Sequence, residues 1–366
     1  MTYDPDLRRD TPLALKLKEQ IKREGPIDVG QFISACLWDE TDGYYATKAI
    51  LGRAGDFITA PEISQVFGEL LGLWAAVVWQ QMGSPDPINL VEFGPGRGTL
   101  MADALRAMGR VPGLEDALNV VLMEASNPLR ELQKTALAKS RARLGWTEGF
   151  PLDGGRPTIL LANEFLDVFA PDQSVKTGQG WRWRAVGLDA EGRFQFTISH
   201  GTRLRGELGE MWPTAASGSI FEDIASDELA VALTRMAKSQ HLAALFIDYG
   251  HMAPVLGETL QAVRGHAFEH SLTSPGEADL SIQVDFAAVA QAMTRAGLTV
   301  DGPITQAEFL GRLGIIERAS KLMSANPAHA GEIEAGVARL MTPNGMGTRF
   351  KAIGIRSPGV PKLPGF

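Results

Sequence analysis

The sequence predicts an α/β protein built on an open, doubly wound, Rossmann-like sheet. Short apolar runs alternate with amphipathic helical runs between residues 88 and 163, the rhythm of β-α-β units in a parallel sheet. The first apolar run, Ile88 to Phe93, ends in a glycine-rich turn that leads directly into a helical pattern. A buried strand, a tight turn and a helix start are typical of sheets that bind nucleotide-like ligands.

A helical layer precedes the predicted sheet. Residues 11–24 begin with Thr-Pro, a helix-start signal, and carry an apolar stripe. A second helix follows Asp28, and a strongly apolar helix, capped by Thr59, runs from about 61 to 81. We therefore expect residues 1–85 to form an N-terminal helical layer that includes a lid.

The core sheet is predicted to be interrupted by an insert. Residues 174–200 alternate with a period of two between glycine-rich turns, which indicates antiparallel strands, and a helical stretch follows over 221–239. The expected core strands lie at 88–93, 119–124, 158–163, 242–250 and 347–355, with a short one around Trp146. The predicted domains are a core of 86–172 and 240–356, a substrate-facing insert of 173–239, and a loose, proline-rich tail of 357–366.

The charge balance disfavours nucleic acid as a partner. The chain has 366 residues, with 35 basic and 43 acidic ones and a net charge of −8. Binding to nucleic acid depends on a basic face, and no run of like charge stands out. Cys36 is the single cysteine, which excludes an internal disulfide and a multi-cysteine zinc site. His266 and His270 lack ligand partners in the sequence pattern, so we expect no metal.

The chain carries no recognisable targeting or membrane-spanning segment. Its first ten residues contain acids and lack the apolar region of a secretory signal. The most apolar window, Leu70 to Trp79, is too short to span a bilayer. We therefore expect a cytosolic protein that does not insert into membranes. The sequence does not predict its oligomeric state.

The spacing of the glycines separates two Rossmann-like ligands. The dinucleotide fingerprint is Gly-x-Gly-x-x-Gly, but its third position here is Thr99. Gly94, Gly96 and Gly98 instead follow Glu92 at alternate positions. This Glu-x-Gly-x-Gly-x-Gly pattern resembles motif I of class I S-adenosylmethionine methyltransferases. The resemblance implies that the three glycines admit S-adenosylmethionine and that Glu92 orients its amino-acid end.

Glu124 is the candidate ribose ligand. It ends the second strand, 26 residues after Gly98, and fingerprint acids lie about 20 residues after the glycine turn. A carboxylate at this place can accept hydrogen bonds from both ribose hydroxyls. The alternative is a solvent-exposed acid at a strand end.

Polar groups directly follow the apolar strand 158–163. Ligands of open α/β sheets bind outside the carboxyl ends of the strands, which places Asn163 and Glu164 beside the reacting methyl group. Asn163, Glu164 and Asp167 suit an amine or guanidinium acceptor, because carboxylates orient N–H groups and one can accept a proton. The alternative is a helix cap at Asn163 and a solvated turn at Asp167.

A second set of polar groups lies at the end of the strand that begins at 242. Asp248 can add a carboxylate at the same edge of the sheet, and His251 is a candidate base. A plain turn explains both residues equally well.

Several short motifs beyond the glycine turn point to one family. They are Gly55-Asp-Phe-Ile-Thr-Ala-Pro-Glu-Ile-Ser64 with Phe67-Gly68, Glu92-Phe-Gly-Pro-Gly-Arg-Gly98, Asn163-Glu-Phe-Leu-Asp167, Asp248-Tyr-Gly-His251, Arg264-Gly-His266, Val284-Asp-Phe286 and Thr305-Gln-Ala-Glu-Phe-Leu310. With these motifs the chain resembles, from about residue 12 to 355, the MidA family, the mitochondrial complex I assembly methyltransferases and their bacterial relatives. The sequence differs from the expected family pattern at Ala307, where we expect Gly, and at Val168-Phe169, in place of Ala-Leu.

This resemblance implies a class I methyltransferase fold. For mitochondrial members it also implies methylation of an arginine in a core subunit of respiratory complex I. We expect the segment 55–64, with Asp56 and Thr59, to cover the cofactor as a lid. Two alternatives stay open: an assembly chaperone that binds S-adenosylmethionine with little catalysis, and a methyltransferase for small molecules.

Overall fold

The structure, a computed structural model, describes residues 8–47, 59–150, 155–199, 206–224, 226–238 and 241–366. These residues divide into two compact units. Unit 1 contains the described residues within Met1–Ala49, Asp167–Ala225 and Ala253–Asp285. Unit 2 contains those within Ile50–Leu166, Ser226–Met252 and Phe286–Phe366.

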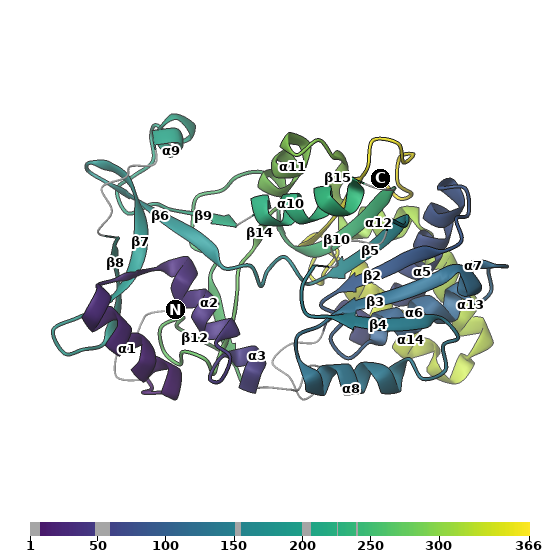
Figure 1. The fold of residues 1–366 in the computed structure, drawn as a ribbon, viewed down its shortest axis with the longest axis horizontal. Coiled ribbons are helices and arrows are strands. Elements are labelled where there is room, and N and C mark those ends of the chain that lie inside the picture. The colour runs from purple at the N-terminus through teal and green to yellow at the C-terminus, as the bar shows by residue number, and fades with distance from the viewer. Residues whose placement is uncertain (1–7, 48–58, 151–154, 200–205, 225, 239–240) are drawn as a thin grey trace. The chain divides into compact units, whose positions relative to one another are not determined.

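Unit 2 is built on a mixed sheet with the order β15-β16-β10-β5-β2-β3-β4 (Figure 1). The neighbours from β10 to β4 run parallel, and β16 is antiparallel to both β10 and β15. This confirms the predicted α/β class. The strands are β2 (Ile88–Phe93), β3 (Leu118–Met123), β4 (Arg143–Thr147), β5 (Thr158–Asn163), β10 (Leu242–His251), β15 (Thr299–Thr305) and β16 (Phe350–Arg356).

The sheet order puts the glycine turn at its topological switch point. From β2 the chain continues to β3 and β4 on one side, and then returns to β5 on the other side of β2. In open α/β sheets, ligands bind at this point, outside the carboxyl ends of the strands. The turn Gly94–Gly98 therefore lies where the architecture favours a ligand site.

Helices pack against this sheet around one apolar core. The core includes Leu90, Val120, Ile159 and Leu245, all of which are buried, and Figure 1 shows α10 and α11 beside β10. The helices of unit 2 are α4 (Ala60–Ile63), α5 (Gln65–Gln81), α6 (Thr99–Met108), α7 (Leu114–Ala117), α8 (Asn127–Ala136), α10 (Ser226–Ala237), α11 (Phe286–Arg295), α12 (Gln306–Arg312), α13 (Ile315–Ala325), η2 (Pro327–His329) and α14 (Ala330–Met341).

The single helix predicted from about 61 to 81 is divided into α4 and α5. Ser64 between them is extended, with φ −156° and ψ 125°, and its Oγ accepts a hydrogen bond from the Val66 N–H at 3.3 Å. Thr59 is the N-cap of α4, as predicted, although its side chain makes no cap hydrogen bond. The break turns α4 away from the axis of α5, which is the long, buried helix.

Unit 1 has two small antiparallel sheets, and the strands predicted over 174–200 lie in the first of them. One has the order β1-β7-β6-β9 with β8 on β7, and the other has the order β12-β11-β13. Residues 220–224 form the strand β9, which pairs with β6. The sequence predicts a helix over 221–239, but the helix begins only at Ser226, because the preceding residues complete the edge of the sheet. The strands of these sheets are β1 (Ile27–Asp28), β6 (Pro171–Thr177), β7 (Gly180–Leu188), β8 (Phe194–Ile198), β9 (Ile220–Ile224), β11 (Gln261–Arg264), β12 (Ala267–Glu269) and β13 (Asp279–Ser281). The short strand β14 (Val284–Asp285) belongs to neither of them.

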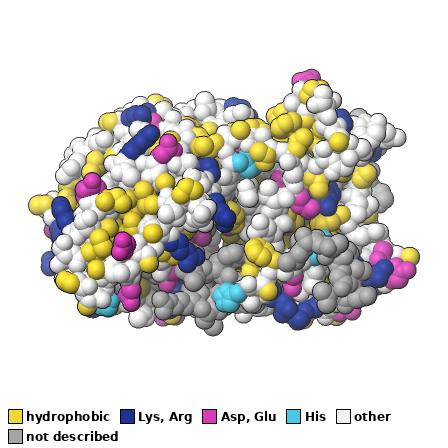
Figure 2. Space-filling view, turned by 180° about the vertical axis from the view of Figure 1, so that it is seen from behind, with side chains coloured by type: hydrophobic (Ala, Val, Ile, Leu, Met, Phe, Trp, Pro, Cys, Tyr) yellow, Lys and Arg dark blue, Asp and Glu magenta, His cyan; other side chains and the backbone are white. Residues whose placement is uncertain are grey.

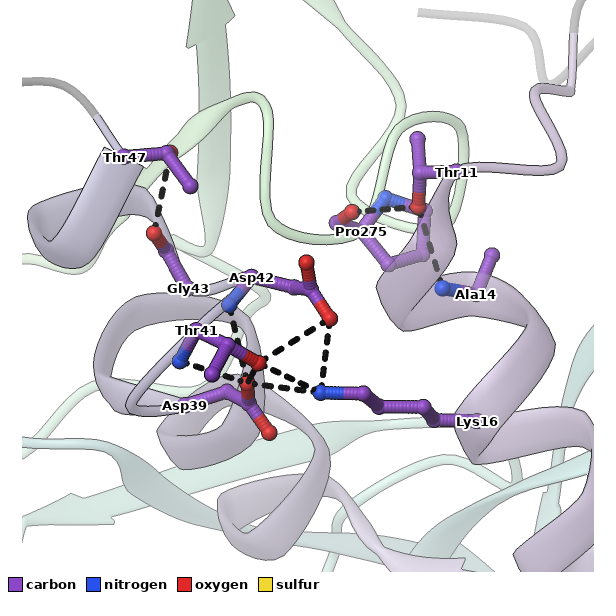
Figure 3. A network of polar contacts seen from close by, with 9 residues as sticks. All are labelled: Thr11, Ala14, Lys16, Asp39, Thr41, Asp42, Gly43, Thr47 and Pro275. Atoms are coloured by element: carbon purple, nitrogen blue, oxygen red, sulfur yellow. Dashed lines mark hydrogen bonds and ion pairs between the residues drawn. The ribbon is translucent and has the colours of Figure 1, made fainter.

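The N-terminal helices α1 (Pro12–Glu24), α2 (Val29–Trp38) and α3 (Tyr44–Thr47) belong to unit 1, which also contains α9 (Gly206–Met211). The apolar stripe of α1 packs with Val186 and Phe194 in one core. Polar contacts fix the same helix: Thr11 Oγ1 donates to the Pro275 carbonyl at 2.7 Å, and the Lys16 ammonium pairs with Asp42 at 2.6 Å (Figure 3).

This division differs from the predicted domain bounds. Residues 253–285 belong to unit 1 and not to the predicted core, and residues 226–238 belong to unit 2 and not to the predicted insert. The N-terminal layer and the tail differ as well. The sequence predicts one N-terminal layer over 1–85, but α1 and α2 share a core with β7 and β8, whereas α5 packs in the core of unit 2. The predicted loose tail also differs, since Val360 and Leu363 are buried and the Leu363 N–H donates to Asp301 at 3.0 Å. Long-range burial of apolar side chains decides both assignments.

No helix in the described part of the chain has the length and apolar character needed to cross a membrane.

Candidate functional site

The turn after β2 requires glycine at three alternate positions. Gly94, Gly96 and Gly98 have φ angles of +61°, +53° and +81°, in the left-handed region where other residues are strained. A Cβ at Gly94 would lie 3.3 Å from the Phe165 ring, and one at Gly98 would lie 3.3 Å from Gln133. The turn therefore depends on glycine for both its conformation and its close packing.

Glu92 is a buried carboxyl group one residue before the end of β2. Only 3% of it is exposed, and its Oε2 has no hydrogen-bond partner among the residues that the structure describes. Burial raises its pKa to about 8, and the nearby charge of Glu124 adds to the shift. A buried, unpartnered acceptor of this kind is costly unless a ligand satisfies it.

Glu124 directly follows β3 and is held by its neighbours. Its Oε1 accepts a hydrogen bond from the Ser126 N–H at 2.8 Å, and its Oε2 accepts one from Gln133 Nε2 at 3.1 Å. Burial raises its pKa, while these hydrogen bonds and Arg130 act in the opposite direction. Glu124 is close enough to Glu92 to affect its titration, so the two acids share one region.

Gln133 is a site residue that we did not predict. It is fully buried on α8, and its Nε2 donates to the Gly96 carbonyl at 2.7 Å as well as to Glu124. The signal was present in the sequence, because Gln133 lies between Leu129 and Leu137 on the apolar stripe of that helix. A polar side chain in such a stripe needs a polar partner.

Asn163 and Glu164 lie together at the carboxyl end of β5. Glu164 has a φ angle of +51°, which is uncommon for a residue other than glycine, and its N–H donates to the Ile247 carbonyl at 2.9 Å. Its Oε1 accepts hydrogen bonds from Asn163 Nδ2 at 3.0 Å and from the Ala60 N–H at 3.1 Å. The Oδ1 of Asn163 is buried without a hydrogen-bond partner in the described structure.

Asp248 supports the turn that carries these residues. It is fully buried, and its Oδ2 accepts hydrogen bonds from the N–H groups of Phe165 at 3.0 Å and Leu166 at 2.8 Å. Its Oδ1 accepts one from the Tyr249 N–H at 2.8 Å. His251 is the last residue of β10. The predicted acid at this edge therefore binds backbone amides.

Three predicted features remain: Asp167, Asp56 and the lid segment. Asp167 begins the second stretch of unit 1, where its charge contributes, after burial and Asp279, to raising the pKa of Tyr45. Asp56 lies outside the described residues. The described part of the predicted lid does reach the site, because Glu62 accepts a hydrogen bond from Thr99 Oγ1 at 2.6 Å at the start of α6.

Among the residues described, no group of three or more His, Cys, Asp or Glu side chains could hold a metal ion.

The fold and the site define an S-adenosylmethionine-dependent methyltransferase of the Rossmann-like class. Residues 70–304 match the family described as “Putative S-adenosyl-L-methionine-dependent methyltransferase”. The chain belongs to this family, and the relatives below support the MidA resemblance. Its cofactor is S-adenosylmethionine.

Two curated relatives are similar over most of the chain. The “Protein arginine methyltransferase NDUFAF7, mitochondrial” of Danio rerio is 33% identical over 92% of this chain and 84% of the relative. The Homo sapiens protein of the same name is 32% identical over 93% and 82%. A Burkholderia thailandensis structure with S-adenosyl-homocysteine bound is 27% identical, has a TM-score of 0.84, and covers 96% of this chain and 93% of its own.

These relatives contradict the predicted cytosolic location. Proteins similar to this chain over nine-tenths of its length are named as mitochondrial. The prediction rested on the acidic first residues, which lack an apolar segment. Those residues carry no information about where proteins with this fold act in the cell.

Proposed function

We propose that this methyltransferase transfers a methyl group to an arginine side chain of a protein. The observation that carries the proposal is the Glu164 carboxylate, which is fixed at the carboxyl end of β5 by two donors. A guanidinium group presents N–H donors that match a carboxylate, and the pair is strong when both are ionised. The names of the curated relatives agree with an arginine acceptor.

The cofactor is assigned to the glycine turn. S-adenosylmethionine supplies, when bound, a methyl group already activated on a sulfonium. The positive φ angles of Gly94, Gly96 and Gly98 shape a turn whose backbone would approach the cofactor closely. Glu124 would accept hydrogen bonds from the ribose hydroxyls. Glu92 Oε2 and Asn163 Oδ1 are unpartnered acceptors, which suit the donors of a methionyl ammonium group.

Glu164 and Asn163 would orient the guanidinium nitrogen, and the Glu164 carboxylate would accept the proton that this nitrogen loses. Most of the rate would come from positioning and from the electrostatics of a site that excludes water. Asp248 would act as a positioning residue because it holds the Phe165 and Leu166 amides. Further roles for Asp167 and His251 stay predictions.

The substrate would be a protein, and the family resemblance implies a subunit of respiratory complex I. On the face seen in Figure 2, dark blue Lys and Arg side chains are scattered among apolar and acidic ones. That face therefore offers nucleic acid no continuous basic surface among the residues drawn in colour. The substrate-facing role of residues 173–239 and the cofactor contacts of the lid segment remain predictions.

Transfer of a labelled methyl group from S-adenosylmethionine to proteins of a cell lysate tests this function. We expect one protein band to gain label with the unaltered enzyme and to lose it with Glu164→Gln. Tight cofactor binding without any labelled protein would favour the chaperone. Label found only in small molecules would contradict a protein acceptor.

A further inference from the structure

The amide of Gln133 connects three separate parts of the cofactor region. Its Nε2 donates to the Gly96 carbonyl at 2.7 Å and to Glu124 Oε2 at 3.1 Å. Its Oε1 accepts a hydrogen bond from Trp146 Nε1 at 2.8 Å. Both amide hydrogens and the carbonyl oxygen are therefore used, on a side chain that is 0% exposed.

Trp146 fixes which end of the amide faces the acid. An indole N–H can only donate, so it must face the oxygen of Gln133 and leave the NH₂ group for the two acceptors. An amide turned the other way would place its oxygen against the Glu124 carboxylate and the Gly96 carbonyl. The network thus has one satisfied arrangement.

Packing holds the same geometry. A Cβ at Gly98 would lie 3.3 Å from Gln133 Cα and Cγ, so α8 approaches the glycine turn directly. Glu124 is further held by the Ser126 N–H at 2.8 Å. The ribose acid and the glycine turn are therefore joined by a single buried side chain.

We propose that Gln133 is a positioning residue that sets the Glu124 carboxylate against the glycine turn for recognition of the cofactor ribose. The inference rests on the ribose role proposed for Glu124. Without the amide, Glu124 Oε2 would lose its donor and the carboxylate could rotate about its side chain. Recognition of the ribose hydroxyls would then weaken more than recognition of the rest of the cofactor.

Calorimetry with S-adenosylhomocysteine and its 2′-deoxyribose analogue tests this proposal. We expect the unaltered protein to prefer the hydroxylated ligand by about tenfold or more, since a lost hydrogen bond to a charged group has this effect. Gln133→Met should reduce the preference to within about threefold, because it keeps shape but removes both donors. Gln80→Met, on the exposed end of α5, should leave it unchanged.

Trp146→Phe keeps Gln133 but releases its amide, so the preference should fall to an intermediate value. An unchanged preference in folded Gln133→Met would overturn the proposal, as would an unchanged preference in Trp146→Phe if Gln133→Met does not fold. Absence of any preference in the unaltered protein would overturn both this role and the ribose role of Glu124. Absence of binding by either ligand would instead reject the assigned cofactor site as a whole.

Discussion

The backbone N–H of Ala60 donates a hydrogen bond to Oε1 of Glu164 at 3.1 Å, across 104 residues of chain. The contact ties the start of α4 to the acid after β5. Glu62 of the same helix accepts a hydrogen bond from Thr99 at the start of α6. Helix α4 therefore contacts both the acid that we propose for catalysis and the start of the helix that follows the glycine turn.

Replacing Glu164 by glutamine should lower the rate of methyl transfer by about a hundredfold, the usual scale for a lost proton acceptor. The substitution keeps the shape of the side chain, so affinity for S-adenosylhomocysteine should stay near that of the unaltered protein. Initial rates with labelled cofactor and calorimetry measure the two effects. Glu332→Gln, at an exposed side chain of α14, is the matched control. A full rate in Glu164→Gln would reject the proposed role.

Cofactor affinity should rise with pH between about 6 and 8, because the pKa of Glu92 is raised to about 8 in the free protein. A bound ammonium group favours the carboxylate, so binding releases a proton below that pH and no longer does so above it. The slope should approach about tenfold per pH unit. Glu92→Gln should bind with a flatter profile, and an identical slope in both proteins would contradict the assignment.

The same group predicts the pH dependence of stability in the absence of ligand. Its pKa is raised from 4.5 to about 8, so the neutral buried form contributes stability that is fully present below about pH 4.5. That contribution is lost as pH rises through about 8. Urea unfolding at several pH values measures it. Glu92→Gln should remove this part of the pH dependence. If the stability of Glu92→Gln still falls by the same amount as pH rises, other groups must cause the fall.

Replacing Gly98 by alanine should weaken cofactor binding as well as folding. Its φ of +81° costs about 1 kcal/mol for a residue with a Cβ. The added Cβ also presses on Gln133 at 3.3 Å. Gly83→Ala is the control, since Gly83 has a φ of +86° with nothing within 4 Å of its Cβ position. Thermal unfolding should show a lower melting temperature for both variants. Calorimetry should show a lower cofactor affinity for Gly98→Ala alone. Equal cofactor affinities of Gly98→Ala and the unaltered protein would show that the turn does not contribute to cofactor binding.

Asp248→Asn should destabilise unit 2 by about 1–3 kcal/mol, because an amide cannot accept at both ends from the three backbone N–H groups that Asp248 binds. Activity should fall together with stability, since the turn carrying Glu164 loosens. Denaturant unfolding and initial rates check both effects. Asp227→Asn, at an exposed surface pair, should change neither. Unaltered stability in Asp248→Asn would show that the turn holds without the carboxylate.

Local patterns predicted the elements that surround the turn. The strands Ile88–Phe93 and Thr158–Asn163 have the predicted bounds, and the helix predicted directly after the glycine turn is Thr99–Met108. A buried parallel strand and an amphipathic helix each have a strong sequence signal. Helix α13 was missed, and residues 221–224 were predicted as helix but form most of β9. Short segments of this kind take their structure from the neighbours against which they pack.

Local sequence patterns do not predict contacts between residues that are far apart in the chain. Glycine spacing and polar groups at strand ends identified Glu92, Glu124, Asn163 and Glu164 as candidates. Gln133 was missed because its partners, Gly96 and Trp146, come from other elements. The sequence pattern likewise could not assign α1 to the same unit as β7. That assignment depends on which apolar surface packs against the apolar stripe of α1.

Tandem mass spectrometry of the protein that gains label tests the central proposal most directly. We predict that the methyl group is on an arginine side chain, and that the modified peptide is absent from an otherwise identical reaction with Glu164→Gln. A methyl group on lysine, on a carboxylate or on a chain terminus would contradict the proposed acceptor.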